Sequence, residues 1–226
     1  MMAPVKPIAA SISNSYFTLQ TTTVNVILKG RLMKQDAKRE TVFEAAATLF
    51  AQYGFRRASM SEIAAAAGIS RPTLYAMFDN KETLFRQLAN HRQNQAIDEA
   101  AAVLAEDAPV ADRVTRAILA YERIYYEPVA GSPHGAEFMD LNNGAALQDM
   151  IDGRNRLIVY LSGAIAAAQA DAPLPGAAMP ARDFAELLML SINGLKKAAS
   201  SIEEFRQKIR EVSGIFMASI TSHTQG

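Results

Sequence analysis

The polar side chains best suited to a chemical role are gathered in one short stretch of the chain, between Ser59 and Lys81. Hydroxyl groups, a guanidinium, a phenol and an ammonium group follow one another there at close intervals. An arginine can donate two parallel hydrogen bonds to a guanine edge, and the other groups can donate to phosphate oxygens. The stretch therefore carries the donors that nucleic-acid recognition requires.

The groups that catalysis or metal binding would need are scattered. His91, His134 and His223 lie far apart, the chain has no cysteine, and no glycine-rich phosphate loop follows a strand pattern. The i, i+3, i+6 spacing of His134, Glu137 and Asp140 could place three metal ligands on one helix face. The simpler interpretation of this spacing is that His134 caps a loop and the two acidic side chains face solvent. We expect no catalytic residue, no metal site and no cofactor.

The elements that must position the polar stretch are two short helices between Met60 and Met77. Ser59 followed three residues later by Glu62 is a capping-box pattern, which starts the first helix. Ser70 is a suitable N-cap for the second helix, and Pro72 falls in its first turn, where a missing N–H costs little. The second helix is therefore expected to begin near residue 71.

Small residues mark the corner between these two helices. Ala64 is small where the helices must approach each other, and Gly68 can adopt the positive φ that a sharp turn needs. Three apolar side chains point into the shared angle: Ile63, Ile69 and Leu74. This is the pattern of a helix-turn-helix, whose second helix presents its N-terminal residues to the major groove.

Three runs of residues at fixed spacing surround this motif: 41–55, 59–78 and 80–85. Together they make the segment from about residue 36 to residue 96 resemble the TetR/AcrR family of bacterial transcriptional regulators. The resemblance implies an all-α fold. In that fold an N-terminal three-helix DNA-binding domain, with its motif at about 59–78, is joined by a long helix to a C-terminal helical domain for ligand binding and dimerisation.

The same resemblance assigns roles to individual side chains. One group is expected to contact base edges in the major groove: Ser61, Arg71, Pro72 and Thr73. A second group is expected to contact DNA phosphates: Ser59, Tyr75 and Lys81. The first group would set sequence preference and the second would set register on the duplex.

The charge of the chain supports a division into two parts. The 226 residues carry no net charge, but residues 1–92 hold 12 Lys and Arg against 6 Asp and Glu, whereas residues 93–226 hold 11 against 17. A basic part that contains the motif suits DNA binding, because phosphate neutralisation supplies much of the affinity. We predict a DNA-binding domain over 36–96 and a second domain over 97–226.

Residues 1–33 are rich in Ser, Thr, Asn and Pro and lack acidic residues and helical periodicity, so we expect a disordered tail. Because the run from Met33 is typical of how members of the resembled family begin, the first 32 residues are also interpreted as an upstream mis-start. The alternative is a basic arm that reaches DNA, using four side chains: Lys6, Lys29, Arg31 and Lys34.

Beyond the motif, helical patterns are expected over 36–53, 81–105, 110–127, 136–142, 145–170, 181–200 and 202–221, and no strand pattern occurs. The resemblance implies nine helices in all and a pocket for a small effector in the second domain. Six aromatic and polar side chains are candidates for that pocket: Tyr121, Tyr125, Phe138, Asn142, Arg154 and Tyr160. An ordinary core would have a similar composition.

The last two helices carry apolar stripes with alternating spacings of three and four residues. The stripes consist of Phe184, Leu188, Leu195, Ile202, Phe205, Ile209, Val212 and Phe216. By resemblance they form a four-helix dimer interface, although packing within one chain would explain part of the pattern.

We therefore expect a homodimeric repressor that binds a palindromic DNA operator and is released by an unknown small molecule. The alternative is a structural or partner-recruiting DNA-binding protein of the same fold without an effector. The longest apolar stretch, 157–170, is too short for a membrane span, and the absence of cysteine is compatible with the cytoplasm. A ligand would act through the helix over 81–105, the one long element expected to join the two domains.

Overall fold

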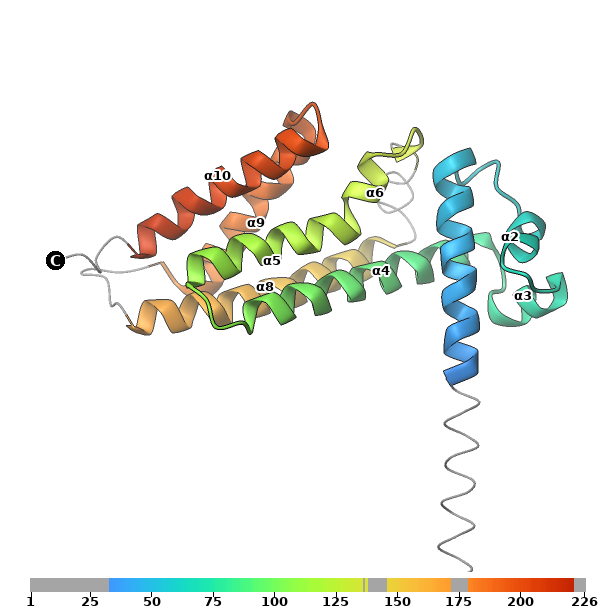
Figure 1. Cartoon of the computed structure of the whole chain (residues 1–226), viewed down its shortest axis with the longest axis horizontal. Coiled ribbons are helices and arrows are strands. Elements are labelled where there is room, and N and C mark those ends of the chain that lie inside the picture. Colours follow the sequence, from blue (N-terminus) through green and yellow to red (C-terminus); the bar gives the residue numbers. More distant parts are fainter. Residues whose placement is uncertain (1–32, 136, 138–145, 172–178, 222–226) are drawn as a thin grey trace, which may run out of the picture.

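The computed structural model describes residues 33–135, 137, 146–171 and 179–221. Every regular element in these ranges is a helix, so the predicted all-α fold is confirmed for the described part of the chain. Figure 1 shows a small head, formed by the N-terminal helix with α2 and α3, at one end of an elongated helical body. The predictions for the tail over 1–32 and for a helix over 136–142 fall almost entirely outside the described residues.

The head is a compact unit of three helices. Its N-terminal helix is described over 33–53 and is followed by α2 (Met60–Ala66) and α3 (Arg71–Met77). Gly54 and Gly68 adopt positive φ, +82° and +66°, at the two turns, where a side chain would be strained. The head core is closed by large buried side chains: Phe43, Phe50, Ile63, Leu74, Phe78 and Leu84.

Helix α4 (Lys81–Leu104) runs from the head into the body (Figure 1). The side chain of Asn80 caps it by accepting a hydrogen bond from the Thr83 N–H at 2.7 Å. Leu88 of α4 belongs to the head core and Ala96 to the body core, both buried. The helix is therefore shared by two apolar cores.

The body packs α4 against α5 (Val110–Tyr125), α6 (Glu127–Ala130), α8 (Leu147–Asp171), α9 (Ala181–Ala198) and α10 (Ile202–Thr221). The sequence predicts one helix over 110–127. In the structure α5 ends at Tyr125, and Pro128 lies in the first turn of α6, where its missing N–H leaves no helical bond unmade. Beyond the break, α6 places Val129 against the head core.

Helices α4 and α8 lie close together at Gln93 and Gly153. The Gln93 side chain, which is 2% exposed, donates hydrogen bonds to the Met150 carbonyl oxygen at 3.1 Å and the Tyr121 hydroxyl at 3.4 Å. A Cβ at residue 153 would collide with the Gln93 carboxamide. The glycine therefore makes room for a buried amide that links three helices.

We expect Gly153→Ala to lower the free energy of unfolding by about 1–3 kcal/mol, because the overpacked amide must shift and lose its partners. Gly163→Ala, on the same helix with open space around its Cβ, is the matched control. It should raise stability by about 0.5–1 kcal/mol through helix propensity. Urea denaturation would measure both changes, and a loss of the same size at both positions would contradict the packing argument.

Candidate DNA-binding site and ligand cavity

The exposed face of α3 is the candidate surface for base contacts. Arg71 and Pro72 are exposed at its first turn, Tyr75 is 43% exposed one turn later, and Leu74 is fully buried in the head core. Within the described residues no acidic side chain pairs with Arg71. The guanidinium is therefore available to bind a base edge, and the buried Leu74 side chain anchors α3 to the head core.

Two caps hold the helices of this motif at their first turns. The Ser59 hydroxyl accepts from the Glu62 N–H at 3.3 Å, and the Ser59 N–H donates to the Glu62 carboxylate at 2.9 Å. These bonds from Ser59 lower the pKa of Glu62 and keep it charged. The Ser70 hydroxyl accepts from the Thr73 N–H at 3.3 Å and lies 2.8 Å from the Thr73 hydroxyl. The capping predictions are confirmed.

Ser59 and Thr73, two of the residues predicted to contact DNA, therefore already have hydrogen-bond partners within the chain. The Ser59 hydroxyl also donates to the Glu62 carboxylate at 2.7 Å, so its first role is to start α2. Thr73 and Ser61 are partly buried. Their contacts with DNA stay predictions.

Lys81 has a role that the sequence did not indicate. Its ammonium group donates to the carbonyl oxygens of Ala58 at 2.8 Å and Arg56 at 3.2 Å, and lies 4.6 Å from the centre of the Phe55 ring. Lys81 therefore fastens the turn before α2 to the start of α4. Its predicted phosphate contact would be additional to this positioning role.

Comparison with known proteins adds to this geometry. Residues 42–88 match the family described as bacterial regulatory proteins, tetR family. Residues of the chain are 35% identical over 68 positions to the transcriptional repressor ComR of Escherichia coli K12, which is 30% of this chain and 32% of ComR. The head is of the TetR type. The match spans only about a third of the length of ComR.

Solved structures extend the likeness of this chain beyond the head. A transcriptional regulator from Cytophaga hutchinsonii aligns with a TM-score of 0.68 and 19% identity, over 80% of this chain and 96% of that one. The regulator FadR from Bacillus subtilis, solved with stearoyl-CoA, aligns with a TM-score of 0.58 and 17% identity, over 78% and 96%. At these identities the likeness establishes the fold of head and body together.

Four of the six predicted pocket residues lie in the described part of the body: Tyr121, Tyr125, Arg154 and Tyr160. Tyr121 is 3% exposed, and its ring centre lies 5.5 Å from that of Tyr125. Burial raises the pKa of both phenols, so they stay neutral donors. Arg154 is partly buried and acts electrostatically on Tyr121, but Tyr160 is 48% exposed on α8. Phe138 and Asn142 lie outside the described residues.

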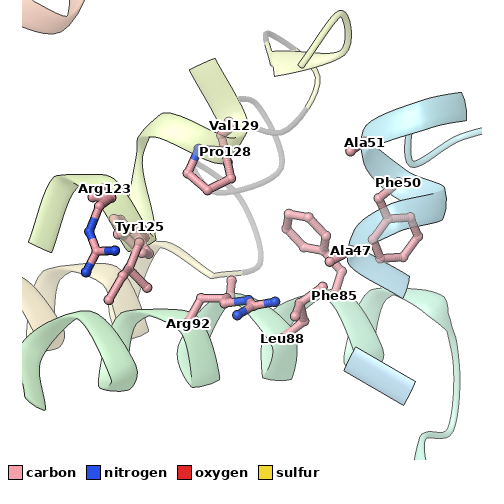
Figure 2. Close-up of a pocket in the computed structure, with 12 residues that line it drawn as sticks. Ala47, Phe50, Ala51, Phe85, Leu88, Arg92, Arg123, Tyr125, Pro128 and Val129 are labelled. Atoms are coloured by element: carbon pink, nitrogen blue, oxygen red, sulfur yellow. The ribbon is translucent and has the colours of Figure 1, made fainter. Parts of the chain in front are cut away.

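The described residues form a cavity at the junction of head and body (Figure 2). It has a volume of about 350 Å³, within the range of small-molecule sites. It is lined by Ala47, Phe50, Ala51, Phe85, Leu88, Ala89, Arg92, Arg123, Ile124, Tyr125, Pro128 and Val129. Tyr125 is the one predicted pocket residue among them. The sequence prediction missed the cavity because its walls come from four helices of both parts.

The predicted dimer stripe needs a correction. Phe184, Leu188, Phe205 and Ile209 are at most 6% exposed in the single chain and belong to the body core. They are covered by their own chain, because α9 and α10 pack on α5 and α8, and so they are not available to a partner. The other four stripe residues are partly buried: Leu195, Ile202, Val212 and Phe216. Their place in a dimer interface stays a prediction.

A different set of side chains forms the exposed apolar face of α9 and α10. Leu187, Leu190 and Ile215 are 44%, 52% and 71% exposed. Exposed Gly194 and Gly214 lie on the same two helices, and a Cβ at either position would meet nothing within 4 Å. This face, which we call the outer face, combines apolar side chains with small residues, as close packing of helices from two chains requires.

None of the described helices is both long and apolar enough to cross a lipid bilayer. Among the described residues, no three His, Cys, Asp or Glu side chains gather as metal ligands. Of the three residues whose spacing was considered for a metal, His134 and Glu137 both lie beside Gly54, and Asp140 falls outside the described residues.

Proposed function

We propose that this chain is a homodimeric, cytoplasmic TetR-family transcriptional repressor that binds a palindromic operator and is released by a small molecule. Arg71 is exposed at the first turn of α3 and pairs with no acidic side chain among the described residues. This observation carries the DNA-binding part of the proposal. Residues 36–96 would form the DNA-binding domain and 97–226 the effector-binding and dimerisation domain. ComR, which the head resembles, is a transcriptional repressor, and this supports negative regulation.

The outer face supports the homodimer. Two heads held at a fixed separation read two half-sites of a palindrome, so operator symmetry follows from the symmetry of the dimer. The four partly buried stripe residues flank this face on the same helices. A symmetric contact here would leave both α3 helices free, since the head lies at the other end of α4 (Figure 1).

The effector part of the proposal is supported by the junction cavity and by the solved complex of B. subtilis FadR with stearoyl-CoA. That complex shows a protein with this fold holding a ligand. A molecule that binds the DNA-incompetent state ten to a hundred times more tightly would weaken operator binding by the same factor. A structural DNA-binding protein without an effector would show no such response.

Arg71→Ala should weaken binding to the operator by about 1–3 kcal/mol, because a buried pair of hydrogen bonds to a base edge is lost. The operator would be selected from random duplexes by the purified protein. Fluorescence anisotropy on the operator and on random DNA measures the effect, and Arg182→Ala, far away on α9, is the control. An equal loss on both DNAs would show that Arg71 does not read a base.

A further inference from the structure

The walls of the junction cavity come from both parts of the molecule. Phe50 belongs to the N-terminal helix, Leu88 to α4, and Pro128 and Val129 to α6. Figure 2 shows Phe50 on one side of the cavity and Pro128 with Val129 on another. Most of the lining is aliphatic or aromatic, so the cavity favours an apolar molecule.

Two arginines give this cavity a basic border. An Arg92 Nη donates to the Glu44 carboxylate at 2.6 Å, and an Arg123 Nη lies 3.3 Å from the Glu99 carboxylate. Another Arg92 Nη donates to the Gln95 side-chain oxygen at 3.2 Å. Each guanidinium has five N–H donors, and these bonds leave several of them unused. A carboxylate at this border of the cavity could accept from the donors that remain.

The cavity also lies between two separate connections from body to head. One is α4 itself. The other follows α6, where the Ser132 hydroxyl donates to the Ala51 carbonyl oxygen at 3.1 Å and the Arg56 N–H donates to the Glu137 carboxylate at 2.9 Å. These hydrogen bonds add a second contact between the two parts beside α4, the one long element that was expected to join them. Val129 packs on the head core between these connections.

We propose that the junction cavity is the effector site, and that its ligand is an apolar molecule ending in a carboxylate or similar anion. This inference rests on the proposed function. Tyr121 and Leu157 are buried in the body core, whereas the junction offers both space and unused donors. A ligand there touches the N-terminal helix and α6 together, so it fixes the angle of the head directly.

The test uses decanoate as the anionic probe and decanol as its neutral counterpart. Isothermal titration calorimetry on the full chain measures probe binding, and anisotropy measures operator affinity with and without probe. We expect decanoate to bind and to weaken operator binding. We expect decanol to bind at least about tenfold more weakly, because it cannot accept charge-assisted hydrogen bonds from the arginines.

Two sets of variants locate the site. Ala89→Phe fills the cavity from α4 and should weaken decanoate binding at least about tenfold, whereas Ala102→Phe, exposed on the same helix, should not. Arg92→Gln with Arg123→Gln leaves the apolar walls intact. This pair should weaken decanoate about tenfold and decanol little. Arg182→Gln is the matched control, and thermal unfolding shows whether each variant is folded.

The outcomes separate this inference from the proposed function. If decanoate releases the operator equally from wild type and from both cavity variants, the effector acts elsewhere and the inference is overturned, although repression by release stands. Failure of wild type to bind decanoate at millimolar concentration would also overturn it. If wild type binds no operator, the repressor proposal fails, while loss of decanoate binding in both cavity variants would still support the site.

Discussion

Replacing Lys196 by Met should cost about 3–5 kcal/mol of the free energy of unfolding, because it leaves a buried carboxylate without its cation. Glu122 on α5 is fully buried, and its Oε2 lies 2.9 Å from the Lys196 ammonium. The Glu122 oxygens have no well-aligned hydrogen bond among the described residues, so the attraction is mainly electrostatic. Few single substitutions elsewhere in the body should cost as much.

The loss should depend on pH in a defined direction. Burial raises the pKa of Glu122 above its ordinary value of 4.5, against the opposing effect of Lys196. Without the cation this pKa rises further. The native state then holds a proton that the unfolded chain has released, so stability should fall as pH rises from the ordinary glutamate range through the raised pKa. Below that range the variant should regain part of its stability.

Glu122→Gln in the Lys196→Met background is the control for this prediction. It removes the buried charge, so most of the stability should return and the pH dependence should disappear. Lys196 also lies 4.7 Å from the centre of the Tyr126 ring, and that contact would not be restored. Chemical denaturation at several pH values measures all three proteins. If the double variant is as unstable as Lys196→Met, the ion pair is not the cause of the loss.

The second large effect is expected at the outer face. Ile215→Glu or Leu190→Glu would place a charge at the centre of the proposed dimer contact, at positions exposed in the single chain. We expect a folded monomer whose operator affinity is lower by roughly 100-fold or more, since the second half-site no longer adds its binding. Light scattering, circular dichroism and anisotropy would measure mass, fold and DNA binding.

Phe205→Glu serves as the contrast. Phe205 is 2% exposed and packs against the Tyr126 ring at 5.1 Å between ring centres, so this variant should unfold instead of becoming a monomer. Ala102→Glu, exposed on α4, should change neither mass nor DNA binding. If Ile215→Glu and Leu190→Glu both remain folded dimers, the dimer contact lies on another surface.

Signals within a few residues of each other determined the head of this protein. The capping box of Ser59 and Glu62, the cap at Ser70 and the positive φ of Gly68 all depend on neighbours in the chain, and the structure has each where it was predicted. The exposed first turn of α3 with Arg71 follows from them. The sequence could predict this part because its hydrogen bonds close over about one helical turn.

The tertiary structure alone decided the features that depend on residues far apart in the chain. A stripe such as Phe205 and Ile209 is apolar whether it faces α5 of its own chain or a partner, and only packing showed that it faces inward. Lys81 gained its role from carbonyl oxygens more than twenty residues earlier. The junction cavity exists because α6 returns to the N-terminal helix. Periodicity reports which side chains are buried, but it carries no information about which surface buries them.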